Sequence, residues 1–492
     1  MTRQILVIIA VLFSITISTM AGGLNPTAPP GETMKTLQEI APRTPLRQAD
    51  FPLTITESGS YYLTENVTMF FDFNIGIVIN SSDVMIDLMG YTISGPPISF
   101  ANGISITDLG TNIKIKNGTV KNFGLNGIAG DLLSKEIRIT GVSVTDNSQG
   151  GISLPGSNVV IKDCFIVNNG DSAGVDVYGI RCGTNAMVIN NHIIGNGNQA
   201  LTIVYGIHVT NNSICMNNIV SKNGYQSAGY LVYGIYYSEG ATIKNNTIVS
   251  NGSLAHSADV TGIYGNLGGI IVGNTVKGNG NGGTILSGAN KVMGIWIEND
   301  GGMINNNAVV KNGYKANDYV RGILGASGLQ VFNNKVSGNG ELAPENVYGI
   351  FVGNGCKISG NVVFDNGRDV TGVNIIYGIL CGYNNLVTGN TVSKNGDNVN
   401  TITGIRSNDG SIITQNNVSE NGTNALQVDG IVAKTGCTVS KNNVFKNGVG
   451  GFLLAGITVE DFCLIESNTA YSNGGPNLVY GTGCVLVNNV AP

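Results

Sequence analysis

Aromatic and basic residues recur at one fixed place in this sequence, two residues after a glycine that is usually followed by isoleucine. The only tryptophan of the chain, Trp296, belongs to this row. Aromatic faces suit the rings of sugars, and flanking cations attract acidic groups. The pattern therefore indicates a ligand-binding surface made of Arg181, His208, Tyr236, Tyr264, Trp296, Phe351 and Arg406, with Leu324 and Leu380 among them.

The same row is also compatible with a structural role. Aromatic residues have a high β-propensity and stack well across neighbouring strands, so the row is consistent with ordinary packing on a sheet surface. It is equally consistent with a surface that is buried beneath a partner chain.

A pair of carboxylates offers a different chemistry. The segments GYKANDYVRG (313–322) and GELAPENVYG (340–349) have the same length, so Asp318 is expected to stack on Glu345. Two carboxylates roughly 5 Å apart raise one pKa or attract a cation such as Ca²⁺. With Arg321 beside them, they are the candidate catalytic group. The alternative is a solvated pair on a bend, neutralised by Arg321 or Lys315.

The elements that must position these residues follow from a repeat. Glycines recur at intervals of 24 to 32 residues, and isoleucine follows in the first fifteen cases. Their positions are Gly76, Gly103, Gly127, Gly151, Gly179, Gly206, Gly234, Gly262, Gly294, Gly322, Gly349, Gly378, Gly404, Gly430, Gly456 and Gly481. A row of asparagines has the same period: Asn191, Asn218, Asn246, Asn274, Asn307, Asn334, Asn361, Asn390, Asn417, Asn443 and Asn468. An Asn-Gly pair recurs in each unit from Asn169 to Asn473. A period of this length indicates stacked supersecondary units.

The units are predicted to be turns of a parallel β-helix. The segments between these recurring glycines and asparagines are short and rich in β-branched residues, and their apolar and polar residues alternate. None of them carries the apolar stripe of a helix. Stacked asparagines donate to one copy and accept from the other, which favours a ladder. The Asn-Gly pairs supply bends with positive φ. We therefore expect an all-β, single-stranded parallel β-helix of about 16 coils, with each isoleucine directed inward.

The N-terminus has a different character. Arg3, an apolar run to about Ile17 and the small residues near Ala21 are typical of a secretory signal peptide. We expect a signal peptide at 1–21, a linker and cap at 22–51 with a short capping helix at 33–42, and the β-helix domain at 52–492. The mature chain is thus expected to be secreted, with no membrane span.

Composition restricts the partners. The net charge is −5 and charged residues make up only 12 % of the chain, without a segment dense in Lys or Arg, which argues against nucleic acid. The eight cysteines are dispersed from Cys164 to Cys484. Stacking makes a Cys437–Cys463 disulfide geometrically feasible, and a ladder of buried thiols is the alternative.

These repeats resemble the pectate-lyase-like superfamily of right-handed parallel β-helices, and most of all its short-repeat branch of carbohydrate-binding and sugar-hydrolase proteins. The resemblance covers about residues 52–492 and implies the fold, but it implies several functions. The Gly-His-Gly and Asp-Pro-His-Glu motifs of the superfamily's hydrolases and epimerases are absent, and the loops are short. We therefore expect binding of a polysaccharide or another extended surface ligand. A polysaccharide lyase or glycoside hydrolase and a structural or adhesive rod are the alternatives, and the sequence leaves the oligomeric state open.

Overall fold

The computed structural model describes residues 42–70, 75–96, 100–171, 173–227, 229–255, 258–282, 289–343, 345–370, 375–450 and 453–492. Residues 45–492 form one compact unit. The predicted signal peptide (1–21) lies outside the described residues, as does the predicted capping helix (33–42) except for its last residue. The described part contains one helical element, the 3₁₀ helix η1 (Gln48–Asp50).

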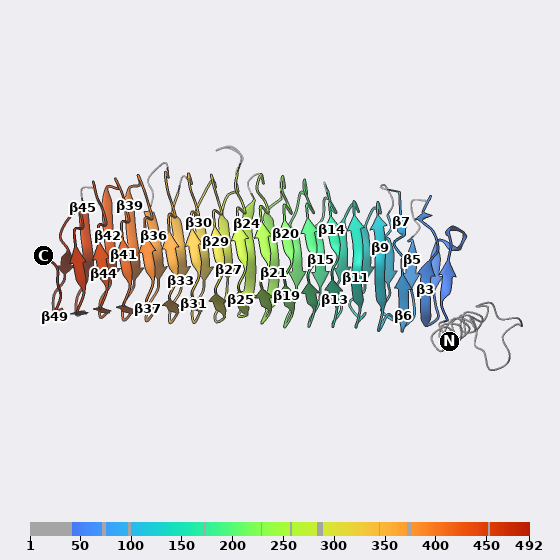
Figure 1. Cartoon of the computed structure of the whole chain (residues 1–492), viewed down its shortest axis with the longest axis horizontal. Coiled ribbons are helices and arrows are strands. Elements are labelled where there is room, and N and C mark those ends of the chain that lie inside the picture. The colour runs from blue at the N-terminus through green and yellow to red at the C-terminus, as the bar shows by residue number, and fades with distance from the viewer. Residues whose placement is uncertain are drawn as a thin grey trace, which may run out of the picture. The chain divides into compact units, whose positions relative to one another are not determined.

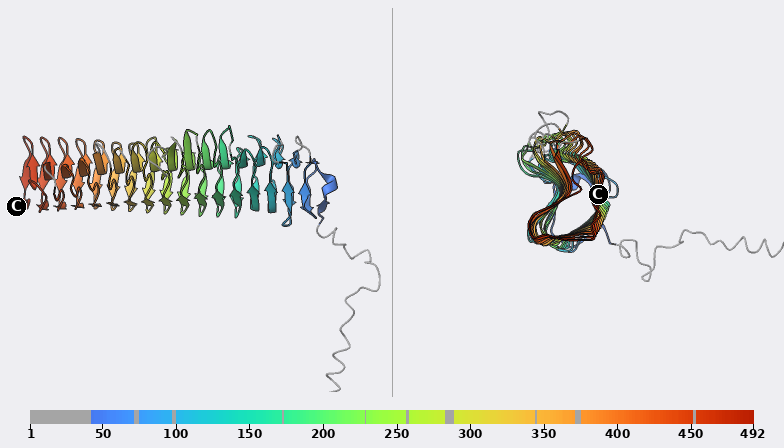
Figure 2. Two further views of the ribbon diagram at one scale, coloured as in Figure 1. Left: turned by 90° about the horizontal axis from the view of Figure 1, so that it is seen from above. Right: turned by 90° about the vertical axis from the view of Figure 1, so that its left-hand side faces the viewer.

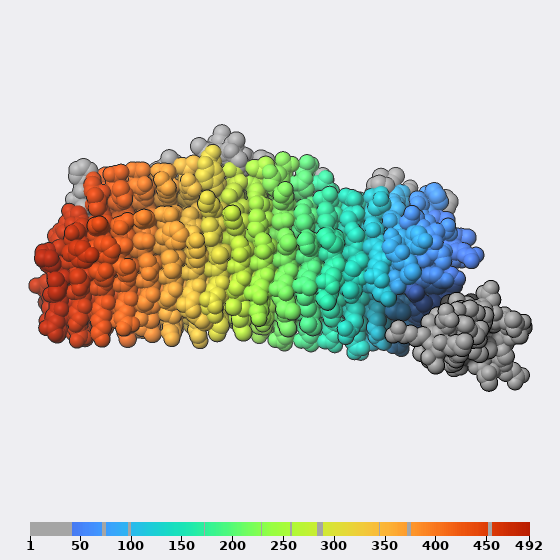
Figure 3. Space-filling view, viewed as in Figure 1, coloured from blue at the N-terminus to red at the C-terminus, as the bar shows by residue number. Residues whose placement is uncertain are grey.

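The unit is a stack of turns, most of which contribute three short strands (Figure 1). In one turn these are β21 (Leu231–Glu239), β22 (Thr242–Lys244) and β23 (Thr247–Val249). Each strand pairs in parallel with its equivalents in the turns before and after, as β21 does with β18 (Val204–Val209) and β24 (Asp259–Leu267). The predicted parallel β-helix is confirmed, and the space-filling view shows the turns packed side by side along the unit (Figure 3).

The strands fall into three positions within the turn. The first strands are β2 (Leu53–Ile55), β5 (Ile77–Ile79), β8 (Ile104–Ile106), β10 (Asn126–Gly130), β12 (Gly150–Leu154), β15 (Val177–Cys182), β18, β21, β24, β27 (Val292–Ile297), β30 (Val320–Gly325), β33 (Val347–Val352), β36 (Ile375–Cys381), β39 (Thr401–Ser407), β42 (Gln427–Ala433), β45 (Leu453–Val459) and β48 (Leu478–Tyr480). The second strands are β1 (Thr44–Leu46), β3 (Gly59–Leu63), β6 (Val84–Asp87), β13 (Val160–Lys162), β16 (Met187–Ile189), β19 (Ile214–Met216), β22, β25 (Ile270–Val272), β28 (Met303–Asn305), β31 (Gln330–Phe332), β34 (Lys357–Ser359), β37 (Leu386–Thr388), β40 (Ile412–Thr414), β43 (Thr438–Ser440), β46 (Leu464–Glu466) and β49 (Val485–Val487). The third strands are β4 (Val67–Thr68), β7 (Thr92–Ser94), β14 (Phe165–Val167), β17 (His192–Ile194), β20 (Ile219–Ser221), β23, β26 (Thr275–Lys277), β29 (Ala308–Val310), β32 (Lys335–Ser337), β35 (Val362–Phe364), β38 (Thr391–Ser393), β41 (Asn417–Ser419), β44 (Asn443–Phe445) and β47 (Thr469–Tyr471), while β9 (Lys114–Lys121) and β11 (Arg138–Thr145) run through the second and third positions.

Two asparagine ladders line the bends on either side of the third strands. In the first ladder, Asn218 Nδ2 donates to Asn246 Oδ1 over 2.9 Å, and Asn246 donates in the same way to Asn274 over 3.0 Å. The second ladder is formed by the Asn-Gly pairs, where Asn223 donates to Asn251 over 2.9 Å. The asparagines of both ladders are buried except at the C-terminal end, where Asn473 and Asn489 are half-buried. The sequence analysis predicted the first ladder. It also predicted a positive φ for the glycine of each Asn-Gly pair, and φ is 60° at Gly252. It did not predict that the asparagines of these pairs form the second ladder.

The pairing between strands shows that three of the repeat positions predicted from sequence are wrong. The first ladder passes through Asn416 and Asn442, not through the predicted Asn417 and Asn443, which begin β41 and β44. Leu478 lies beside Ile457, so Gly481 is out of phase with the earlier glycines. The Gly-Ile pair therefore marks fifteen turns, not the predicted sixteen.

The glycine of each Gly-Ile pair forms a waist between two lobes, which the view along the unit shows (Figure 2, right). A Cβ added at Gly234 would lie 2.5 Å from the Gly262 carbonyl oxygen and 2.5 Å from Ile248 Cγ2, on the facing third strand. The large lobe holds the main core, which includes all the inward isoleucines such as Ile235. The small lobe has a core of its own, made of the valine or isoleucine before the waist and of alanines and valines from the loops: Val177, Ala200, Val204, Val232, Ala255, Ala258, Val260, Ala289, Val292, Ala316, Val320, Ala343, Val347, Val370, Ile376, Val399, Ile402, Ala425 and Val428.

Candidate ligand-binding face

Two rows of side chains meet on the outer side of the waist. The glycine and isoleucine both face inward, so the residue before them and the residue after them both face outward. The row before the glycine is Tyr178, Tyr205, Tyr233, Thr261, Met293, Arg321, Tyr348, Tyr377 and Thr403. The row after the isoleucine is Arg181, His208, Tyr236, Tyr264, Trp296, Leu324, Phe351, Leu380 and Arg406, in the predicted order. We call these two rows together the aromatic face.

Ring contacts continue from turn to turn along the second row. His208 stacks on Tyr236 with ring centroids 4.8 Å apart, and Tyr236 stacks on Tyr264 at 4.9 Å. Tyr264 meets Trp296 edge to face at 4.9 Å, and its hydroxyl donates a hydrogen bond to Glu298. Such offset and edge-on pairs stabilise each other by about 0.5–1.5 kcal/mol beyond area burial. The rings are therefore held in place before a ligand arrives.

Side chains of the first row pack against those of the second row. Tyr178, Tyr205 and Tyr233 stack on one another, and Tyr205 also meets Tyr236 edge to face at 5.5 Å. The repeat predicts from sequence that the tyrosines before the glycines fill a corner of the core: Tyr178, Tyr205, Tyr233, Tyr348, Tyr377 and Tyr480. Tyr205 and Tyr233 are indeed buried, but they form a cluster with the outer aromatic residues and are separate from both cores. Tyr480, which was assigned to the same row, is exposed and pairs with Val459 instead.

Cations lie at intervals along the aromatic face. Arg181 lies over the ring of Tyr178 at 5.0 Å, and Arg406 lies 6.0 Å from the ring centroid of Tyr377. Arg321 occupies a position of the first row, where its guanidinium is 5.0 Å from the ring of Phe351 and 5.3 Å from that of Tyr348. Stacking of this kind leaves the edge of the guanidinium available to an anion.

The carboxylate pair forms, but without its predicted arginine. Hydrogen bonding with Asp318 and the negative charge of Asp318 raise the pKa of the exposed Glu345. The pKa of Asp259 is also raised, because of its burial, with Lys291 opposing and Asp318 adding to the shift. Arg321 forms no ion pair with Asp318 or Glu345; its side chain lies on the aromatic face instead. The structure thus brings together two of the three predicted catalytic residues.

Neither a metal centre nor a disulfide is formed by the residues that the structure describes. In these ranges no group of three or more His, Cys, Asp or Glu side chains is arranged to hold a metal ion. All eight cysteines are free. Cys437 and Cys463 belong to a thiol stack, in which the Cys437 backbone N–H donates to Cys463 Sγ over 3.3 Å.

His208 is a neutral member of the aromatic face at physiological pH. Burial, and secondarily the charge of Arg181, lowers the pKa of His208 from 6.5 to about 4. Its Nδ1 is buried without a hydrogen-bond partner, and Tyr178, Tyr205 and Tyr236 surround its ring. A proton on this imidazole would be poorly solvated and close to a guanidinium.

This burial predicts a pH dependence of stability. Between pH 6.5 and 4 the unfolded chain binds a proton at His208 that the folded chain does not. The contribution of neutral His208 to the free energy of unfolding should be complete above pH 6.5. It should decrease as the pH falls and level off near pH 4, with a total loss of about 3 kcal/mol. Thermal unfolding over this range checks it. The His208→Phe variant keeps the stacking and should lose this component; an unchanged pH profile in the variant would contradict the assignment.

The comparisons with known proteins agree with this architecture. Residues 54–223 match the family model of the right-handed β-helix region. The chain is a right-handed parallel β-helix. This confirms the architecture that the resemblance to the pectate-lyase-like superfamily implied. Among curated proteins, none matches the sequence significantly.

Several solved structures align with this chain at low identity and low TM-score. The A-module of mannuronan C-5 epimerase from Azotobacter vinelandii is 12 % identical, with 78 % of this chain and 85 % of that one covered and a TM-score of 0.36. A family 6 polysaccharide lyase specific for mannuronic acid, from human gut microbiota, is 13 % identical, with coverages of 74 % and 86 % and a TM-score of 0.34. The tailspike of E. coli bacteriophage HK620, in complex with a pentasaccharide, is 12 % identical, with coverages of 87 % and 72 % and a TM-score of 0.31. At these TM-scores the likenesses identify neither a function nor a ligand for this β-helix.

Proposed function

We propose that this β-helix is a secreted protein that binds an acidic polysaccharide along its aromatic face. The observation that carries the proposal is the unbroken series of ring contacts from His208 to Trp296 on an outer surface, with arginines on the same face. Rings of this kind serve as stacking platforms, and the arginines serve as partners for carboxylates or sulfates.

The geometry favours an extended ligand over a compact one. Equivalent residues recur once per turn at roughly the 4.8 Å spacing of paired strands. A ligand with repeating units therefore meets repeating contacts. Because each ring is already packed against its neighbours, little side-chain freedom is lost on binding.

Trp296 is the best single residue with which to test this site. It is half-buried and lies between Tyr264 and Leu324 in the second row. Truncation of an aromatic anchor at a binding surface costs about 1–3 kcal/mol, so Trp296→Ala should weaken polysaccharide binding roughly tenfold or more. Affinity gel retardation on a panel of acidic polysaccharides measures it. Tyr383→Ala, at an exposed position outside the aromatic face, is the matched control.

The outcome separates binding from simple packing. If Trp296→Ala binds every polysaccharide of the panel as tightly as the parent protein does, the aromatic face is only a packed surface. Trp296→Phe keeps a ring at this position and should retain most of the affinity.

Secretion is part of the proposal and rests on the N-terminal sequence at 1–21. In the described part of the chain, no helix has the length and apolar character needed to cross a lipid bilayer.

A second candidate function is polysaccharide cleavage at Asp318 and Glu345. The raised pKa of Glu345 favours it, because a general acid needs a carboxyl whose pKa lies above the ordinary range. Arg321 would then bind an acidic group of the sugar from the neighbouring aromatic face. Release of unsaturated or reducing ends from acidic glycans, with and without Ca²⁺, tests this function, and Glu345→Gln should abolish the release. If no glycan is cleaved, the protein is a binding or structural β-helix.

A further inference from the structure

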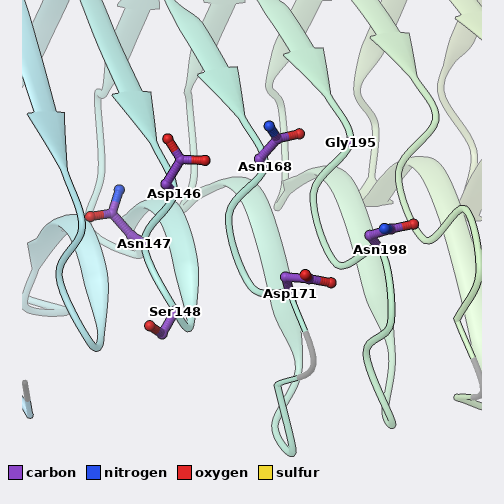
Figure 4. Close-up of a pocket in the computed structure, with 7 residues that line it drawn as sticks. All are labelled: Asp146, Asn147, Ser148, Asn168, Asp171, Gly195 and Asn198. Carbon is purple, nitrogen blue, oxygen red and sulfur yellow. The ribbon is translucent and has the colours of Figure 1, made fainter. Parts of the chain in front are cut away.

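Three hollows open at the same place in the turn, at the bend between a third strand and the small lobe. One has a volume of about 440 Å³ and is lined by residues from three successive turns: Asp146, Asn147, Ser148, Asn168, Asp171, Gly195 and Asn198. Figure 4 shows these residues on consecutive bends, where polar groups recur from turn to turn.

The other two hollows adjoin each other nearer the C-terminus. Their volumes are about 400 and 340 Å³, and both are lined by Asp365 and Arg368. Together they extend over five successive turns, from Val310 to Thr423. We call this pair the polar furrow. Each hollow lies within the size range of small-ligand sites, which is roughly 300–1,000 Å³.

The polar furrow and the aromatic face lie on opposite sides of the waist. In the turn of Gly378, the added Cβ would lie 3.4 Å from Asn395 Nδ2, which belongs to the second ladder on the facing wall. Asn395 and the bend that follows it line the furrow, whereas Tyr377 and Leu380 flank Gly378 on the aromatic face. One ligand cannot occupy both surfaces of the same turn.

The lining has a balanced charge. The lining contains four cations, Lys311, Lys335, Arg368 and Lys394, and four carboxylates, Glu341, Asp365, Asp397 and Glu420. Lys394 pairs with Glu420 over 3.7 Å, and Arg368 pairs with Asp369 over 3.6 Å. An acidic ligand would therefore meet carboxylates as often as cations.

The same lining suits hydroxyl groups. A hydroxyl donates one hydrogen bond and accepts others, so it can use carboxylates and cations alike. Asp397 Oδ1 is buried without a hydrogen-bond partner and needs a donor. The ring of Phe364, with Lys335 5.4 Å from its centroid, supplies an apolar surface in the same hollow.

We propose that the polar furrow is a second carbohydrate site, which takes a short neutral oligosaccharide. This site goes beyond the proposed binding of an acidic polysaccharide and does not depend on it. A β-helix with both sites would hold two different glycans on the two sides of its waist.

The test measures neutral hexasaccharides against the intact protein. Cellohexaose, maltohexaose and xylohexaose are titrated by calorimetry into the parent protein, into Arg368→Ala/Asp397→Ala, and into the control Lys244→Ala/Glu239→Ala, whose charges are exposed and lie outside the furrow. The furrow variant should lose at least tenfold in affinity for the hexasaccharide that binds, and the control should lose none. Circular dichroism checks that both variants fold.

Trp296 distinguishes the two sites. It is the only tryptophan and lies on the aromatic face, so a ligand in the furrow should leave its emission unchanged. The proposal is overturned if none of the three hexasaccharides binds, if the furrow variant binds as tightly as the parent, or if binding alters Trp296 emission. The aromatic-face proposal would survive each of these results, because it concerns acidic polysaccharides.

Discussion

Gly234→Val is expected to open the waist of its turn and to loosen the aromatic face beside it. The new Cβ would lie 2.5 Å from a backbone oxygen, Gly262 O, and 2.5 Å from Ile248 Cγ2. The backbone atom cannot rotate away, so the two walls of the turn must separate. Overpacking of this kind costs about 3 kcal/mol or more when backbone must move. Amides of the turns around Gly206, Gly234 and Gly262 should exchange with solvent roughly 100-fold faster.

The effect should stay local, because each turn of a solenoid contacts only its neighbours. Amides of the turns around Gly404 and Gly430 in the same molecule thus serve as an internal reference. Gly174→Val is the matched variant, since a Cβ at Gly174 meets nothing within 4 Å and should leave exchange unchanged. Equal protection in Gly234→Val and Gly174→Val would show that the glycine is not required for the waist.

Asn416→Leu is expected to break the first ladder. Asn416 Oδ1 accepts from the Asn390 backbone N–H over 2.9 Å and from Asn390 Nδ2 over 3.0 Å, while Asn416 Nδ2 donates to Val387 O over 3.0 Å. Leucine would remove the acceptor of the buried Asn390 backbone N–H and a donor to Val387 O, at roughly 1–3 kcal/mol for each group, while Asn390 Nδ2 keeps its carbonyl acceptors Ile358 O and Thr388 O. A loss of about 2–6 kcal/mol is therefore expected, measured as loss of amide protection from Asn390 to Asn442.

The neighbouring residue provides the control. Asn417 is half-buried, begins β41 and lies outside the ladder, and its Oδ1 has no hydrogen-bond partner. Asn417→Leu should change protection by less than about 0.5 kcal/mol. If Asn417→Leu proved the more damaging change, the ladder would follow the path predicted from sequence rather than the one in the structure.

The β-helix itself was predictable because equivalent positions in successive turns of a stacked fold have the same environment and therefore need the same kind of residue. Inward isoleucines and stacked asparagines are required wherever strands repeat at the same place, and they appear as rows in the sequence. The misplaced ladder positions arose where two asparagines adjoin, at 416–417 and 442–443. The spacing in the sequence could have identified the correct asparagines. Most other ladder asparagines lie 12 residues after the glycine of the Gly-Ile pair in their turn, as Asn416 and Asn442 do.

The candidate site was only partly predictable. The order of the second row followed from the repeat. The residue before the glycine faces outward only because the glycine and the isoleucine at the waist both face inward, and the repeat does not show this. A strand with strict alternation would direct that residue to the same side as the isoleucine. Arg321 was grouped with the carboxylates because it is close to them in the same or the adjacent turn, although it lies one residue before Gly322, as Tyr348 lies before Gly349. The small lobe was missed because its core combines valines and isoleucines of the first strands with small residues that are dispersed over the loops.

The most direct test of the central claim is a titration of Trp296 fluorescence with polygalacturonate, polymannuronate and hyaluronan. Trp296 is the only tryptophan and lies within the aromatic face, so its emission reports contact at this surface alone. We predict a saturable change in emission with at least one of these polysaccharides, and an affinity that falls roughly tenfold in Arg321→Ala. Retardation of the protein by a polysaccharide without any change in Trp296 emission, or no binding to all three, would contradict the account.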